Sequence, residues 1–313
     1  MVALCERFGR YKMYSEEAST VQIGDGLTQR HDAVLNFLRT GGRLGRRADV
    51  PELAARTNYF RESYAYGDDA RDGVRPFLHH PAFVAAAQTI HGRPLVEPAI
   101  VYANILLPGQ ELAVHTDVPE FRGANRLRYP QWLMVVMHHS RLFDEWRLPI
   151  ATGVAWFNDC TGGEFVFYPD GPDGAPAVLP ARRNTAVVLD TDSVFHGVDP
   201  VASTTPLPPL RPGMALEYAG AGRWRVVADG ADVATYRWEE LRFSVSWKAY
   251  CFRDDAERRA WRAHSEDLDL PVILDRLLAD LRARGRMGAS RPDDTTLALT
   301  LIDEYVRFPA AVT

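Results

Sequence analysis

The sequence predicts a mainly β domain with helices at both ends, and two observations favour this class. Between residues 98 and 252, short β-type runs bounded by Gly, Pro or Asp follow one another without clear helices between them. On either side, residues 1–97 and 253–313 contain helical patterns. Short strands in close succession are typical of an antiparallel sandwich or barrel, so the helices would pack on its outside.

The N-terminal segment, residues 1–97, contains two predicted helices. The first, at 31–42, ends in a pair of glycines, and the second covers 80–93. Glycine directly after the last helical residue is a common stop signal. We therefore expect this segment to support the β region from outside.

The β region, 98–252, contains nine predicted strands. They lie at residues 99–107, 111–118, 132–139, 152–159, 163–169, 184–190, 194–201, 224–229 and 240–252. The proline-rich stretch within it indicates an insertion at 200–238 and not a linker between domains. Two further helical patterns, at 254–285 and 296–308, complete the chain, so we expect a single domain over 1–313.

Composition excludes several classes of protein. The 313 residues are 46% hydrophobic and 25% charged, which is the balance of a globular protein with a core. The net charge of −5 argues against a nucleic-acid-binding protein or one drawn to anionic membranes. Three distant cysteines and no apolar run near the ~20 residues of a membrane span predict a cytoplasmic protein.

One histidine and one aspartate stand out in the β region. His115 and Asp117 lie two residues apart in a β-type run, so strand alternation directs both side chains to one face. Together with one distant histidine, this pair would form the two-histidine, one-carboxylate set that binds non-haem iron(II).

Spacing alone is weak support for such a site. With nine His and 41 acidic residues in 313, chance predicts about one pair of this spacing, and the chain has a second, His264 and Glu266. That pair lies in a charged, helical stretch, where residues two apart diverge, so we expect surface side chains there.

A longer series of motifs resembles the 2-oxoglutarate and iron(II)-dependent dioxygenase superfamily. The resemblance covers about 98–252 and consists of Asn104-x3-Pro108-Gly109, His115-x-Asp117, Gly162-Gly163-Glu164, Pro180, His196-Gly197-Val198-x-Pro200-Val201 and Arg242-x-Ser244. It implies a double-stranded β-helix core, the distorted jelly roll related to cupins. It also implies that His115, Asp117 and His196 are the iron ligands.

Two other histidines and one glycine pair are assigned no chemistry. His138 and His139 are adjacent in a predicted strand, so we expect one to be packed and the other solvated. Gly162-Gly163 is expected to form a tight turn before a strand.

The last predicted strand carries the expected co-substrate site. Arg242, Ser244, Ser246 and Lys248 share one face, and periodicity alone would place this polar face in water. The resemblance implies the opposite, with Arg242 inside the barrel, binding the distal carboxylate of 2-oxoglutarate, and Ser244 assisting. Arginine suits this role because its planar guanidinium binds a carboxylate through two hydrogen bonds.

Two weaker assignments follow from the nucleic-acid demethylase branch of the superfamily. Asn104 lies eleven residues before His115, and Lys248 lies six after Arg242, as co-substrate-binding residues do in that branch. The tyrosine of that branch is Leu106 here, however. The 200–238 insertion also lengthens the usual interval before Arg242, and it could form an extra ribbon or a lid.

The resemblance implies an oxygenase that uses iron(II), 2-oxoglutarate and O₂. Hydroxylation of an unactivated C–H bond of a small molecule, with release of succinate and CO₂, is the expected reaction. Desaturation, cyclisation and epimerisation use the same ligands and stay open. A metal-binding cupin-like protein that is not an oxygenase is the alternative from another class, and it would not need Arg242.

Overall fold

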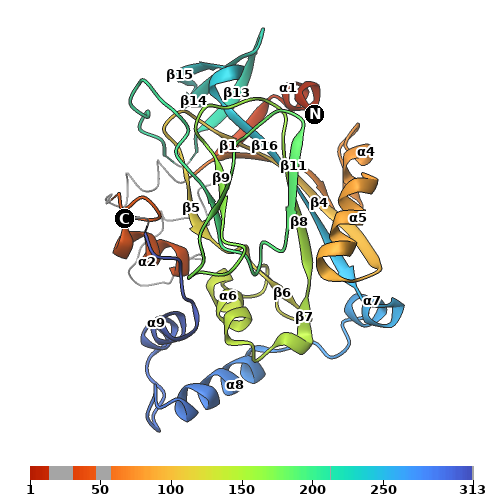
Figure 1. Cartoon of the computed structure of the whole chain (residues 1–313), viewed down its shortest axis with the longest axis vertical. Coiled ribbons are helices and arrows are strands. Elements are labelled where there is room, and N and C mark those ends of the chain that lie inside the picture. The colour runs from red at the N-terminus through yellow and green to blue at the C-terminus, as the bar shows by residue number, and fades with distance from the viewer. Residues whose placement is uncertain (14–30, 47–57, 212, 312–313) are drawn as a thin grey trace.

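The computed structural model describes residues 1–13, 31–46, 58–211 and 213–311 (Figure 1). Its strands are β1 (Arg10–Met13), β2 (Phe60–Tyr66), β3 (Asp69–Ala70), β4 (Leu95–Leu106), β5 (Leu112–His115), β6 (Glu120–Phe121), β7 (Arg147–Leu148), β8 (Ile150–Trp156), β9 (Phe165–Phe167), β10 (Ala177–Leu179), β11 (Thr185–Leu189), β12 (His196–Val198), β13 (Ala215–Gly220), β14 (Arg223–Ala228), β15 (Ala231–Arg237) and β16 (Arg242–Phe252). Its helices are α1 (Val2–Phe8), α2 (His31–Thr40), α4 (Arg75–Leu78), α5 (Pro81–His91), α6 (Gln131–Ser140), α7 (Asp255–Arg262), α8 (Leu270–Ala283) and α9 (Asp294–Tyr305), with short 3₁₀ turns η1 (Asp144–Trp146) and η2 (Trp238–Glu240).

The predicted jelly-roll core is confirmed. The large sheet has the order β11-β8-β16-β4-β2-β1-β13-β14-β15, with β3 beside β2, and the small sheet has the order β10-β9-β12-β5. From β4 to β12 the chain passes repeatedly from one sheet to the other, and from β13 to β16 it stays in the large sheet. Val154, Phe165 and Val198 belong to one buried cluster between the two sheets. Mainly antiparallel strands with helices outside are therefore the architecture of this chain.

One face of β16 and β4 points into the space between the two sheets, and its side chains line the pocket. Arg242, Ser244 and Ser246 lie opposite Leu106, Asn104 and Tyr102 of β4, and these residues line the space between the sheets.

The other face of β16 lies under the helices on the outside of the large sheet. Trp247 stacks on Phe83 of α5, with ring centroids 5.3 Å apart, and its Nε1 donates to the carbonyl of Leu78, 2.6 Å away. The polar face of β16 is thus inside, as the resemblance implied and as periodicity alone did not.

The predicted strand at 132–139 is wrong, because these residues form helix α6. Every residue of α6 except His139 is buried, so the run has no polar face to reveal a helical period. A short, uniformly apolar run does not distinguish a strand from a buried helix. His138 and His139 therefore do not point to opposite faces of a strand. Their rings lie 5.4 Å apart, and that of His139 stacks on Phe195.

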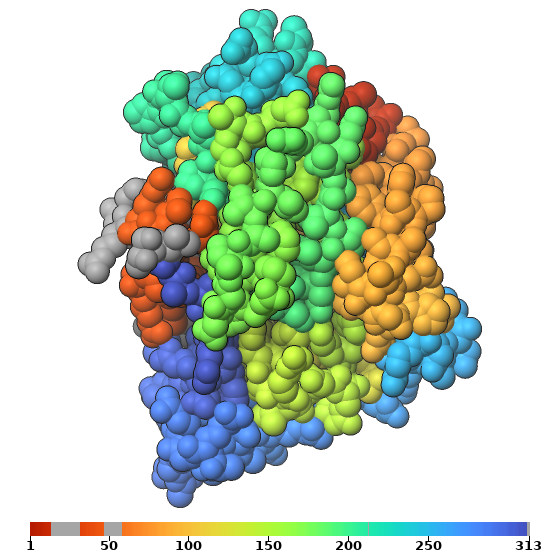
Figure 2. Space-filling model, in the orientation of Figure 1, coloured from red at the N-terminus to blue at the C-terminus, as the bar shows by residue number. Residues whose placement is uncertain are grey.

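Helix α6 belongs to a segment, 117–149, inserted between β5 and β8. One hydrophobic cluster joins α6 to α8 and α9, and it also includes Val114, Val166 and Phe195 from the core or its connections. In Figures 1 and 2, the yellow-green insertion and the blue C-terminal helices lie together below the sheets. The insertion and these helices therefore cover this end of the jelly roll.

The 200–238 insertion forms a ribbon and not a lid. Its strands β13, β14 and β15 form an antiparallel meander that extends the large sheet from β1. None of the described residues between 202 and 241 lines the pocket between the sheets. Strands β2 and β1 connect β4 to this meander in the large sheet, and β3 pairs with β2. All three lie in the N-terminal segment, where the sequence predicted only helices and loops.

The C-terminal helices follow the prediction with one break. The pattern at 254–285 is divided into α7 and α8, and Asp269 caps α8 by accepting a hydrogen bond from the amide of Val272, 3.0 Å away. Among the described helices, none has both the length and the apolar character that crossing a membrane requires.

Candidate metal centre

Three potential metal ligands meet where β5 and β12 pair. His115 ends β5 and lies directly opposite His196, the first residue of β12, while Asp117 follows two residues after His115. Asp117 Oδ1 lies 3.7 Å from His115 Nε2 and 3.8 Å from His196 Nε2. Since each bond to a divalent ion is about 2.1 Å, donors this far apart can share one ion. Among the described residues, these three form the one such cluster of His, Cys, Asp or Glu.

Hydrogen bonds orient both imidazoles for a metal. His115 Nδ1 lies 2.7 Å from the carbonyl of Ala113, and His196 Nδ1 lies 2.9 Å from the carbonyl of Val194. A carbonyl only accepts, so Nδ1 carries the hydrogen and the lone pair of Nε2 faces the cluster. Burial lowers the pKa of His196 to about 4, so that its ring is neutral at pH 7.

The carboxylate of Asp117 is held from the side away from the histidines. Its Oδ2 accepts hydrogen bonds from Lys248 Nζ and from Thr191 Oγ1, each at 2.7 Å. Burial opposes the charge on Asp117, but Lys248 and the two histidines keep its pKa well below the usual range. Asp117 is therefore ionised, which is the form that binds a metal.

Lys248, expected at the co-substrate, has a different partner in the structure. Its ammonium group binds Asp117 and is absent from the lining of the pocket. Burial opposes the charge on Lys248, but Asp117, Tyr102 and Asp192 raise its pKa above the usual range. Asp192 is fully buried, and burial raises its pKa to about 8.

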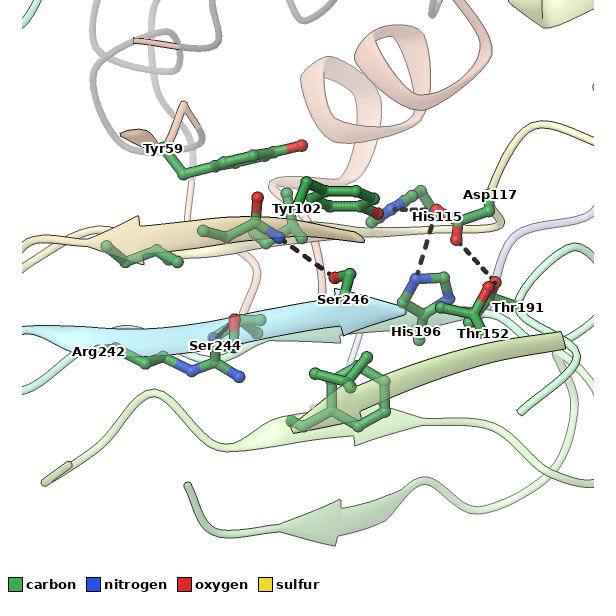
Figure 3. Close-up of a pocket in the computed structure, with 16 residues that line it drawn as sticks. Tyr59, Tyr102, His115, Asp117, Thr152, Thr191, His196, Arg242, Ser244 and Ser246 are labelled. Atoms are coloured by element: carbon green, nitrogen blue, oxygen red, sulfur yellow. Dashed lines mark hydrogen bonds and ion pairs between the residues drawn. The ribbon is translucent and has the colours of Figure 1, made fainter. Parts of the chain in front are cut away.

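The pocket itself extends between the sheets from the metal-ligand cluster to Arg242 (Figure 3). It encloses about 540 Å³ of space, including the open solvent at its mouth. Its polar lining includes Asn104, Ser244 and Ser246. Asn104 Nδ2 lies 3.4 Å from Ser246 Oγ, and Asn104 Oδ1 is buried without a hydrogen-bond partner.

Arg242 has one guanidinium nitrogen that the protein leaves unsatisfied. Its side chain is 2% exposed; Nε donates to the carbonyl of Gly163, 2.6 Å away, and Nη1 donates to Ser244 Oγ, 3.3 Å away. Nη2 is buried with no hydrogen-bond partner. Burial lowers the pKa of Arg242 to about 10, so it is charged at pH 7. A buried, unpartnered cationic donor in a pocket fits an anionic ligand such as a carboxylate.

The structure brings together most of the residues singled out in the sequence. His115, Asp117 and His196 form the cluster, while Arg242, Ser244 and Asn104 line the same pocket. The second pair, His264 and Glu266, lies at the surface, with side chains 79% and 72% exposed. His138 is also separate from the cluster, since its Nε2 lies 3.1 Å from Ser193 Oγ.

Sequence reasoning missed several residues of the site. Thr191 holds Asp117, Gly163 accepts from Arg242, and Tyr102 and Trp156 contribute their rings to the pocket or its wall. Thr191 lies five residues before His196, but this position points to a contact with Asp117 only once the segments around Asp117 and His196 are known to meet. At Gly162-Gly163, where a tight turn was expected, both residues have a positive φ, of 69° and 64°, and Gly162 forms an isolated antiparallel bridge with Val201.

Comparisons with known proteins are limited to solved structures, because no family profile and no curated protein matches the chain. A Pseudomonas putida prolyl-4-hydroxylase is 14% identical, with 63% of this chain and 73% of that chain covered and a TM-score of 0.33. A 2OG-Fe(II) oxygenase family protein from Burkholderia pseudomallei is 13% identical, with coverage of 74% and 93% and a TM-score of 0.35. HygX from Streptomyces hygroscopicus, solved with nickel and 2-oxoglutarate, is 10% identical, with coverage of 62% and 70% and a TM-score of 0.35. The solved structures to which this chain is similar thus include one described as a 2OG-Fe(II) oxygenase family protein and one solved with 2-oxoglutarate bound.

Proposed function

We propose that this chain is an iron(II) and 2-oxoglutarate-dependent oxygenase that oxidises a C–H bond of a small molecule. The observation that carries the proposal is the combination of two features in one pocket. The cluster of His115, Asp117 and His196 lies at one end, and the unsatisfied Nη2 of Arg242 lies toward the other. A ligand that chelates a metal through one end and presents a carboxylate at the other would join them, and 2-oxoglutarate has this form.

The donor set fits the proposed metal. Two imidazoles and one carboxylate are the ligands that non-haem iron(II) oxygenases use, and they leave positions open for other ligands. When bound, iron(II), 2-oxoglutarate and O₂ supply an oxidative decarboxylation that yields succinate and CO₂ and oxidises a C–H bond. The protein supplies the placement of these groups in a pocket between the two sheets.

The residues of the chain have separate tasks in this proposal. His115, Asp117 and His196 bind the metal, with both imidazoles oriented by backbone carbonyls. Arg242 binds the distal carboxylate of the co-substrate through Nη2, and Ser244 keeps the guanidinium in place through its hydrogen bond to Nη1. Asn104 offers its unsatisfied Oδ1 to a donor in the pocket.

Hydroxylation of a small molecule is the reaction we propose first. The net charge of −5 argues against a nucleic-acid substrate. Desaturation, cyclisation and epimerisation would use the same metal and co-substrate residues. A metal-binding cupin-like protein without oxygenase activity would leave the buried Nη2 of Arg242 without a purpose, and this observation favours the oxygenase.

Anaerobic reconstitution with iron(II) and 2-oxoglutarate tests the proposal. The wild-type protein should develop the visible absorption band of 2-oxoglutarate chelated to iron(II). His196→Ala should lose the band together with the metal, and His264→Ala, at the exposed second pair, is the matched control that should keep it. A wild-type protein that binds iron(II) but shows no band at saturating 2-oxoglutarate would favour the cupin-like alternative.

Arg242 provides the sharper half of this test. Arg242→Ala should weaken 2-oxoglutarate binding by roughly thirtyfold to several thousandfold, because losing one partner of a buried charged pair costs about 2–5 kcal/mol. Arg242→Lys should recover part of the loss, since an ammonium group lacks the planar fork. Iron affinity should stay near that of the wild type, and Arg182→Ala, at an exposed arginine, is the control. An affinity for 2-oxoglutarate within threefold of the wild type would show that Arg242 does not bind the co-substrate.

A further inference from the structure

The two carboxylate oxygens of Asp117 have different surroundings. Oδ1 faces the histidines, at 3.7 Å and 3.8 Å from their Nε2 atoms. Oδ2 points away from them and accepts from both Lys248 Nζ and Thr191 Oγ1. Each carboxylate oxygen has two lone pairs, so the two donors occupy both lone pairs of Oδ2. Oδ1 alone is left for a metal.

Both donors are themselves fixed in position. Lys248 lies within β16, directly between Thr152 of β8 and Ile100 of β4, and its side chain is only 14% exposed. The hydroxyls of Thr191 and Thr152 lie 2.7 Å apart. A hydroxyl has one hydrogen, and that of Thr191 goes to the carboxylate, which can only accept. Thr152 must therefore donate to Thr191, and the chain Thr152–Thr191–Asp117 keeps a single orientation.

We propose that Lys248, together with Thr191, makes Asp117 a ligand through one oxygen only and so keeps one further coordination position of the metal open. Lys248 is a positioning residue in this role, because it touches the ligand and not the metal. The inference rests on the proposed function for the identity of the metal site and adds to it a role for a residue that was expected at the co-substrate.

Binding of Asp117 through one oxygen matters because it determines how many coordination positions of the metal are left for other ligands. A six-coordinate metal held by His115, Asp117 and His196 through one atom each would have three positions left, and a chelating 2-oxoglutarate would take two of them. One position would then stay open for O₂. If Asp117 bound through both oxygens, the protein and 2-oxoglutarate would fill every position. Holding Oδ2 away from the metal is therefore a condition for the reaction and not only for metal binding.

Counting water molecules on bound Mn(II) tests the proposal without turnover. Exchangeable waters on Mn(II) raise the relaxation rate of solvent protons, so the rate reports the number of open positions. In Lys248→Met the freed Oδ2 should bind the metal, and the enhancement should fall by about a third without co-substrate, from three waters to two. With saturating 2-oxoglutarate it should fall from one water to nearly none.

Lys12→Met is the matched control, because Lys12 is the chain's other lysine and lies exposed on β1. It should leave the relaxation enhancement unchanged in both states. Thr191→Val removes the second donor to Oδ2 and should lower the enhancement by less than Lys248→Met. If Lys248→Met does not fold, Thr191→Val decides the matter: a decrease supports the proposal, and wild-type enhancement overturns it.

Two results for folded Lys248→Met would contradict the proposal. Wild-type relaxation enhancement would mean that Asp117 still binds through one oxygen. Loss of Mn(II) binding would mean that Lys248 holds the ligand in place without setting how it binds. Failure of the wild type to bind 2-oxoglutarate would instead count against the proposed function. The comparison without co-substrate would then still test Lys248.

Discussion

At the scale of single residues, Gly163 shows how a glycine can position a charged side chain far away in sequence. Its carbonyl accepts from Arg242 Nε, 79 residues later, at 2.6 Å. A Cβ at Gly163 would lie 2.7 Å from Arg242 Cδ, and the residue has a φ of +64°. The backbone of Gly163 therefore serves as a support against which the guanidinium rests.

Substituting this glycine should disturb co-substrate binding more than metal binding. Gly163→Ala should lower the affinity for 2-oxoglutarate by about tenfold or more, since the methyl group displaces Arg242 while a positive φ alone costs only about 1 kcal/mol of stability. Gly171→Ala is the matched control, because Gly171 has a φ of +86° and a Cβ there would meet no other atom within 4 Å. Titration of 2-oxoglutarate into the anaerobic iron(II)-loaded variants measures the difference. Equal affinities of the two variants for 2-oxoglutarate would show that Gly163 does not position Arg242 for co-substrate binding.

The extent to which the site could be predicted depends on how local each relationship is. His115 and Asp117 could be placed on one face because alternation along a strand is a local property. His196 needed the resemblance to a known family. The contacts of Asp117 with Thr191 and Lys248 span 74 and 131 positions, and nothing in the sequence indicates those distances in space. The contact of Lys248 with Asp117 could therefore not be predicted from the sequence.

At the scale of elements, α6 is the clearest failure of sequence reasoning. Its residues carry β-type side chains and lie among predicted strands, but Pro130 precedes them and the helix is buried on nearly all sides. Tertiary packing decided the conformation, because α8 and α9 cover a surface that a lone helix would expose. By contrast, β16 was placed correctly along the chain, and the family resemblance was needed only to choose its inner face.

The burial of α6 makes the protein sensitive to acid through His138. Burial lowers the pKa of His138 to about 2, whereas an unfolded histidine has a pKa of about 6.5. The folded state therefore resists protonation, so this contribution to stability is present above pH 6.5 and is lost as the pH falls. Wild-type protein should lose up to about 1.4 kcal/mol of unfolding free energy per pH unit below 6.5 from this group.

The variant His138→Gln isolates this effect, because glutamine does not titrate. In metal-free protein, urea unfolding at pH 7 and pH 5 should show a smaller loss of stability for His138→Gln than for the wild type. His264→Gln, at a histidine that is 79% exposed, should behave as the wild type does. The same loss for His138→Gln and the wild type would show that His138 is not buried in its neutral form.

At the scale of the whole molecule, the site depends on residues from both sheets. The small sheet supplies His115 and His196, and Arg242 comes from the large one, so the pocket exists only when the sheets are packed together. The sequence could predict a β core with helices outside, because short β-type runs and helical patterns are recognisable within each region of the chain. The meander of β13, β14 and β15 could not be placed, because its attachment to β1 joins segments about two hundred residues apart.

A site shared by two sheets should couple ligand binding to global stability. A ligand that binds only the folded state at 100 times its Kd adds about 2.7 kcal/mol. With an unfolding entropy of about 2.1 cal/mol/K per residue, each kcal/mol raises the Tm of a 313-residue chain by about 1.5 °C. Saturation with Mn(II) and then with 2-oxoglutarate should therefore raise Tm by about 4 °C at each step. Differential scanning calorimetry, with EDTA to remove the metal, measures both steps. Arg242→Ala should keep the metal step and lose most of the 2-oxoglutarate step, because its unsatisfied Nη2 is the proposed contact of the large sheet with the co-substrate. A full second step in Arg242→Ala would mean that 2-oxoglutarate stabilises the protein through the metal alone.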